Sequence, residues 1–140
     1  MPLVNVSDNS VLGNLVVREF NPADGYCRDE VLFASGGSAT TMPMGTVVAK
    51  AAGAATYHKV ASGDLSAAGT TFGVVIGDHY DIKPTFTIAA NVQPLVLAYV
   101  RGPVQLSDYL IRQANALTDA QFTTLFGLMK AQGVIVLKAV

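Results

Sequence analysis

The sequence predicts a mainly β domain with one α-helix close to its C-terminus. Three observations lead to this prediction. Short runs of β-branched and aromatic residues recur from Glu30 onward, turns rich in Gly, Ala and Ser separate them, and one capped helical pattern follows near the end. At 140 residues the chain fits one domain, which can bury roughly two-thirds of the surface of its unfolded form. We therefore expect a small barrel or sandwich with a helix packed against it.

The predicted strands are short and follow one another closely. Each ends where Gly, Ser, Ala or Pro interrupts an apolar or alternating run, which gives strands at 30–33, 46–50, 57–60, 72–76, 86–89, 95–100 and 104–106. The run at 95–100 is nearly continuously apolar, so we expect it to be buried on both faces. Arg101-Gly102-Pro103 then ends it, because proline donates no hydrogen bond to a sheet. A closing strand is predicted at Val134–Leu137.

The helix is predicted over residues 118–132. Thr118 and Gln121 have the spacing of a capping box, in which each side chain binds the backbone N–H of the other residue. Gly127 lies inside the helix at a cost of about 1 kcal/mol relative to alanine, which indicates a close contact there with a sheet or a neighbour. Residues 107–117 are interpreted as a short helix or an ordered loop. One apolar stripe follows the helical spacing: Phe122, Leu125, Phe126 and Met129.

The first part of the chain differs from the rest. Turn-forming residues alternate there with apolar ones, and a possible strand at 15–20 ends at Asn21-Pro22. This strand has no obvious local partner, and residues 3–20 could extend over about 55 Å. We therefore predict an N-terminal arm over residues 1–29 and a β-rich domain over residues 30–140. A frayed terminus is the alternative.

The composition limits the classes of partner. Charged residues make up 14% of the chain, and nine basic and ten acidic residues give a net charge of −1. An average globular domain has roughly 25% charged residues, so apolar surface is left here for other chains to cover. No Lys/Arg cluster is present to bind a phosphate backbone, and the longest apolar run, 94–100, is far below the ~20 residues that span a membrane. We expect a soluble oligomer or assembly component without a direct nucleic-acid or membrane partner.

Residues that could act in catalysis or bind a metal are few and scattered. Cys27 is the single cysteine, and only His58 and His79 could act as imidazole bases. Asp78, His79 and Asp81 offer possible metal ligands within four residues, although such a cluster is more often a solvated turn. No paired carboxylates and no phosphate-binding loop are found. We therefore predict that the protein is not an enzyme and has no catalytic, cofactor or metal site.

The order of these segments resembles the head decoration (cement) proteins of tailed bacteriophages, the group typified by the lambda decoration protein. The likeness covers roughly residues 15–137 and includes the helix at 118–132 and the closing strand. The matching runs are Arg18-Glu19-Phe20-Asn21-Pro22, Tyr26-Cys27-Arg28-Asp29-Glu30-Val31-Leu32-Phe33-Ala34-Ser35-Gly36, Met42-Pro43-Met44-Gly45-Thr46-Val47-Val48-Ala49-Lys50, Tyr57, Ala68-Gly69-Thr70-Thr71-Phe72-Gly73-Val74-Val75-Ile76 and Val100-Arg101-Gly102-Pro103-Val104.

The resemblance implies a decoration-protein fold with an extended N-terminal arm, and a structural role in a virion. Members of this family form homotrimers on the outer surface of the expanded capsid, at threefold positions, where they clamp the major capsid protein against the pressure of packaged DNA. The protein would be made in the host cytoplasm. The arm residues expected to contact the capsid are Val11, Leu12, Leu15, Val16, Val17, Arg18 and Phe20. The residues expected at the trimer interface are Gly36, Gly37, Ala52, Gly53 and Ala54.

Three other interpretations stay open at this point. The first is another virion component of similar composition, such as a β domain of a tail tube or fibre base. The second is a small β-barrel that binds a ligand or a metal through Asp78, His79 and Asp81. The third is a hydrolase that uses Cys27.

Overall fold

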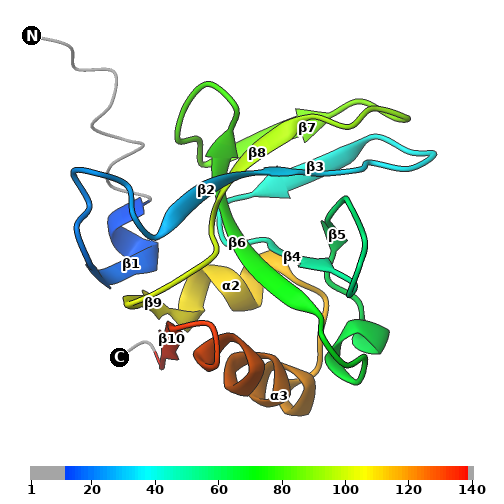
Figure 1. Cartoon of the computed structure of the whole chain (residues 1–140). Helices are drawn as coiled ribbons and strands as arrows, with labels where there is room; N and C mark the ends of the chain where they lie inside the picture. Colours follow the sequence, from blue (N-terminus) through cyan, green and yellow to red (C-terminus); the bar gives the residue numbers. More distant parts are fainter. Residues whose placement is uncertain (1–11, 139–140) are drawn as a thin grey trace, which may run out of the picture.

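The computed structural model of the protein describes residues 12–138, and the strands within this range form three sheets (Figure 1). Residues 12–15 are helical and lead into the first strand. The elements that follow are β1 (Val16–Glu19), β2 (Arg28–Leu32), β3 (Thr40–Pro43), β4 (Val47–Lys50), β5 (His58–Lys59), the 3-10 helix η1 (Ser62–Leu65), β6 (Thr71–Asp78), β7 (Thr85–Ile88), β8 (Leu95–Tyr99), β9 (Val104–Ser107), α2 (Asp108–Ala114), α3 (Asp119–Lys130) and β10 (Val134–Leu137).

A five-stranded antiparallel sheet with the order β2-β8-β6-β4-β5 is the centre of the fold. Alternate residues of its strands enter different hydrophobic clusters, as the period of a strand requires. In β8, Val96 and Ala98 belong to one cluster, while Tyr99 belongs to the other and Leu97 packs against it. The prediction that this apolar strand is buried on both faces is therefore confirmed.

Helices cover one face of this sheet, on its lower side in Figure 1. α3 begins after Thr118, whose side chain and that of Gln121 form the predicted capping box. The side chains of Phe122, Leu125 and Met129 are buried in the larger cluster. Of the two interpretations of residues 107–117, the short helix is confirmed, because α2 forms there and buries Ile111 in the same cluster; the fold-class prediction of one helix is therefore incomplete.

A two-stranded sheet, β3 with β7, covers the other face of the central sheet. Met42 from β3 and Ile88 from β7 contribute to the smaller cluster with Val75 of β6. The sequence did not predict β3. Over the described part of the chain, the strands do not close into a barrel. The fold is mainly β, as predicted, but the barrel form of the prediction is wrong.

The third sheet has the order β1-β9-β10. β1 runs antiparallel to β9, with Val16 opposite Leu106 and Glu19 opposite Val104, and β10 runs parallel to β9. The strand near residues 15–20 has no local partner, as expected, but it is not an unpaired arm, because it pairs with β9 of the same chain. Its partner lies about 90 positions away in the sequence, so no local pattern could reveal it. Over its described part, the predicted arm of residues 1–29 also contributes Leu15 and Cys27 to the larger core cluster.

Gly102 and Gly133 bring the chain before β9 against the chain before β10. A Cβ atom on Gly102 would overlap the carbonyl oxygen of Gly133, and Gly133 has a φ of +84°, which favours glycine. Gly127 differs from both, because apart from its chain neighbours and the adjacent backbone of its own helix, no described atom lies within 4 Å of where its Cβ would be. The predicted contact of Gly127 with a sheet is therefore wrong.

These glycines give a matched pair of variants. Gly102→Ala should lower the free energy of unfolding by about 2 kcal/mol or more, because the backbone has to separate to admit the methyl group. Gly127→Ala should raise it by roughly 0.5–1 kcal/mol, because alanine favours the helix and meets no obstacle. Denaturant unfolding followed by circular dichroism measures both values, and equal effects would contradict the predicted packing.

Candidate functional site

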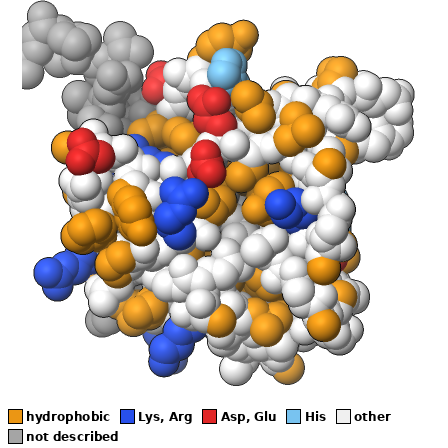
Figure 2. All heavy atoms as spheres, in the orientation of Figure 1, with side chains coloured by type: hydrophobic (Ala, Val, Ile, Leu, Met, Phe, Trp, Pro, Cys, Tyr) orange, Lys and Arg blue, Asp and Glu red, His pale blue; other side chains and the backbone are white. Residues whose placement is uncertain are grey.

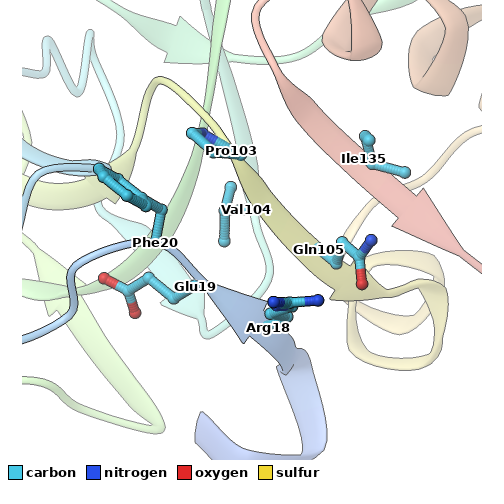
Figure 3. A pocket seen from close by; sticks show the side chains of 7 residues that line it. All are labelled: Arg18, Glu19, Phe20, Pro103, Val104, Gln105 and Ile135. Atoms are coloured by element: carbon cyan, nitrogen blue, oxygen red, sulfur yellow. The ribbon is translucent and has the colours of Figure 1, made fainter.

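A groove of about 370 Å³ lies on the outer face of the three-stranded sheet. The strand register places Arg18 of β1 beside Gln105 of β9, and Gln105 beside Ile135 of β10, so the three side chains cross the sheet in one row (Figure 3). Phe20 and Pro103 line one end of the groove. The backbone N–H of Phe20 donates to the Pro103 carbonyl over 3.0 Å, which holds this end in place.

The groove combines apolar walls with one cation and one amide. Arg18 is exposed, and no carboxylate of the described residues forms an ion pair with it. Glu19 also lines the groove, but its side chain is only 4% exposed and its carboxylate is used elsewhere. The groove can therefore accept an apolar side chain together with an acidic or carbonyl group from a partner.

β1 and the turn that follows it also carry exposed apolar and aromatic side chains. Val17, Phe20 and Tyr26 are 56%, 53% and 49% exposed. The rings of Phe20 and Tyr26 meet edge to face with centroids 5.6 Å apart, and the Arg101 guanidinium lies 5.8 Å from the Tyr26 ring centre. Figure 2 shows hydrophobic side chains gathered at the left of the molecule, over the region of β1 and β9, with basic side chains among them. Aromatic and arginine side chains are enriched at the energetic centres of protein interfaces.

A buried ionic network lies directly behind this surface. The carboxylate of Glu19 accepts hydrogen bonds from Arg28 Nε at 2.9 Å and Arg28 Nη2 at 2.8 Å. It also accepts one from the hydroxyl of Tyr99 at 2.6 Å. Burial, together with this hydrogen bond to Glu19, raises the pKa of Tyr99. The network joins β1 to β2 and β8, so it fixes the strand that carries the exposed residues.

Cys27 is buried beneath the same region and is not poised for nucleophilic chemistry. Its side chain is fully buried, and its thiol donates weakly to the carbonyls of Phe20 at 3.6 Å and Pro103 at 3.5 Å. Burial raises the pKa of the Cys27 thiol, although Arg101 and Arg28 act in the opposite direction. The loss of hydration on burial is the larger effect, so the pKa of the thiol stays above its usual value.

The structure divides the predicted capsid-contact residues by their exposure. Val17, Arg18 and Phe20 are exposed, and Arg18 and Phe20 line the groove. Leu15 is fully buried in the core, so the prediction that it contacts a partner is wrong. The remaining predicted residues either pack partly against the core, as Leu12 and Val16 do, or lie outside the described residues, as Val11 does.

The predicted trimer-interface residues lie in two exposed connections. Gly36 and Gly37 are in the connection from β2 to β3, and 52–54 are in the turn from β4 to β5. An isolated bridge between Phe33 and Tyr57 joins the bases of these connections. The structure contains a single chain, so their role between subunits stays a prediction.

The possible metal ligands of the alternative interpretation, Asp78, His79 and Asp81, are engaged in local interactions. Asp78 accepts from the backbone N–H groups of Tyr80 and Asp81, both at 2.9 Å, and pairs with Lys83. The nearest partner of His79 is Glu30, at 3.4 Å. Among residues 12–138, no three His, Cys, Asp or Glu side chains gather where they could hold a metal ion. No helix in the same part of the chain is long and apolar enough to cross a membrane.

Five residues that line the groove were not predicted from the sequence: Glu19 of β1, Pro103 just before β9, Val104 and Gln105 of β9, and Ile135 of the closing strand. The exposed Tyr26, in the turn between β1 and β2, was not predicted either. For Ile135 the sequence did contain a signal. Side chains alternate between the two faces of a strand, so Ile135 lies on the face opposite the buried Val134 in β10. Comparison of the chain with protein-family models, with curated proteins and with solved structures finds no match.

Glu19→Gln should lower the free energy of unfolding by about 3 kcal/mol, because it leaves the charge of Arg28 without its partner in a largely buried site. The matched control is Asp29→Asn, which removes the exposed ion pair with Arg101 and should cost less than about 1 kcal/mol. Urea unfolding of both variants tests the difference. Similar losses for the two variants would show that the buried network is not a major support.

The thiol of Cys27 should not react with a chromogenic thiol reagent at pH 8 while the protein is folded. Burial removes access, and the raised pKa leaves little thiolate, which is the reactive form. One thiol per chain should react after unfolding in guanidinium chloride. Complete reaction within the mixing time in the absence of denaturant would contradict this prediction and reopen the hydrolase interpretation.

Proposed function

We propose that this protein is a capsid decoration protein, which binds the outer surface of an expanded phage head as a trimer and stabilises the shell. The resemblance to the decoration family supports this proposal through the order of motifs across residues 15–137. The mainly β fold is compatible with it. The finer decoration-protein fold, the major capsid protein as partner and the position on the virion surface are parts of the same proposal.

The observation that carries the proposal is the outer face of the three-stranded sheet, which no described helix or strand covers. Arg18 and Phe20 line the groove there and belong to the run that resembles the decoration proteins, and Val17, next to them in the chain, is exposed as well. A side chain such as Phe20 contributes about 1.5–3 kcal/mol when a partner buries it fully. We assign the capsid contact to this face, in place of an extended strand over residues 15–20.

A trimer makes such a small contact sufficient. Three equal surfaces on one particle engage three neighbouring sites, and after the first contact the others bind at a high effective concentration. A shell that offers the complementary surface only after expansion would bind the protein selectively in that state. No catalytic group is required for this role, which agrees with the burial and the raised pKa of the Cys27 thiol.

The test is co-sedimentation of the purified protein with undecorated heads of the same phage, expanded and unexpanded. The wild type should bind expanded heads saturably, in multiples of three copies per site. Val17→Ser with Phe20→Ser should weaken binding by at least about tenfold, because the change removes more than about 1.4 kcal/mol of apolar burial. The control is Leu128→Ser on α3, which removes a side chain of 38% exposure away from this face.

The outcome also separates the alternatives. Binding to tails or fibres in place of heads would favour another virion role. Absence of binding to either form of the head would remove the decoration proposal, whereas equal binding by the double variant would remove only the assignment of the contact face.

A further inference from the structure

The strand β10 is an open edge of the three-stranded sheet. It pairs in parallel with β9, and no described strand lies on its other side. In a parallel pair, successive residues turn their backbone groups alternately toward and away from the neighbouring strand. The hydrogen bond from the Val104 N–H to the Gly133 carbonyl, 3.3 Å long, sets this alternation. The N–H and C=O groups of Val134 and Val136 therefore point away from β9.

This edge lacks the features with which proteins commonly prevent strand addition. β1 has a bulge between Val16 and Arg18, β2 carries three charged residues at 28–30, and β5 is only two residues long. β10 is formed by four apolar residues, Val134–Leu137, without proline, charge or a bulge. Leu137 is moreover 39% exposed. An unprotected apolar edge of this kind is a template for another strand.

We propose that the open edge of β10 accepts residues 3–6 of a second copy of this chain as an added strand. The sequence there is Leu3-Val4-Asn5-Val6, four residues that match the length of β10 and include three apolar ones. Residues 1–11 precede the described structure and, if extended, could span about 36 Å. That length is enough for the segment to reach a neighbouring subunit.

The arrangement of the sheet favours a second copy over the same chain. β1, which the N-terminal segment precedes, and β10 lie on opposite sides of β9, and the inner face of this sheet is filled by the core. A segment that stayed on its own subunit would have to pass from the β1 side of the sheet to its β10 side. In a head-to-tail arrangement, the β1 side of one copy faces the β10 edge of the next without a crossing. Such an interface closes into a ring when the rotation permits.

The inference concerns self-association alone and goes beyond the proposed function. It is tested on purified protein without any capsid, so its failure would leave the contact of Val17, Arg18 and Phe20 with a shell untouched. Failure of head binding would likewise leave strand exchange standing.

Val136→Pro blocks the edge selectively. Its N–H points away from β9, and proline is tolerated at edge positions whose N–H faces solvent. Val136→Ala is the matched control, because it loses the side chain but keeps the N–H. A chain lacking residues 1–11 keeps every buried core residue described, from Leu15 to Val134. By sedimentation velocity, the wild type and Val136→Ala should be oligomeric, while Val136→Pro and the truncated chain should be monomeric.

Mixing the two monomeric variants gives the sharpest result. Val136→Pro supplies a segment without an open edge, and the truncated chain supplies an edge without a segment. The mixture should form one-to-one heterodimers and nothing larger. A wild type that is monomeric at all concentrations, an oligomeric truncated chain, an oligomeric Val136→Pro variant or a mixture without heterodimers would each overturn strand exchange.

A second measurement does not depend on the proline variant being folded. A synthetic peptide of residues 1–11 should bind the truncated chain saturably and shift the amide resonances of Val134 and Val136, while a scrambled peptide should not. Absence of binding, or binding that leaves these two resonances unchanged, would overturn the proposal even if Val136→Pro fails to fold.

Discussion

The carboxylate of Glu19 joins two of the sheets, and the rest of the structure depends on this junction. Glu19 ends β1 in the three-stranded sheet, while its partners Arg28 and Tyr99 belong to the neighbouring strands β2 and β8 of the central sheet. A buried charge is tolerated only when it is paired and its hydrogen bonds are satisfied. Here both oxygens are engaged, and the guanidinium also lies 5.6 Å from the Tyr99 ring centre. The hydrogen bonds of Glu19 therefore hold β1 in position against β2 and β8.

The exposed surface is a geometric consequence of this junction. Neighbouring residues of a strand point to opposite faces, so a buried Glu19 places Arg18 and Phe20 on the outer side. Cys27 fills the space next to the junction, and its weak hydrogen bonds reach the carbonyls of Phe20 and Pro103 on either side. The surface that carries the proposed contact is thus held by rigid packing. Because these side chains are already held in place, less conformational entropy is lost when a partner binds them.

The sequence predicts elements well where a local pattern is sufficient. The capping residues at Thr118 mark where α3 begins, and apolar runs mark β4, β6 and β8 to within a few residues. It fails where structure depends on distant partners. β3 contains only one buried side chain, Met42, and ends in proline, so its pairing with β7 has no local signal. For the same reason Glu19, placed between Arg18 and Phe20 in the chain, resembles an ordinary surface charge. The candidate site was predicted only in those residues that alternation leaves exposed.

The two proposed contacts use different parts of one small sheet, and this places a physical constraint between them. In the proposed assembly, the outer face of β1 meets the shell, while the segment preceding β1 crosses to β10 of the next copy. Strand exchange would therefore fix the outer faces of neighbouring copies relative to one another through about ten residues of chain and the Glu19 junction. Fixed spacing is what simultaneous engagement of several sites requires, because avidity is lost when the geometry does not match. A change at β10 that prevents exchange would then weaken attachment to a shell without altering any residue that touches it.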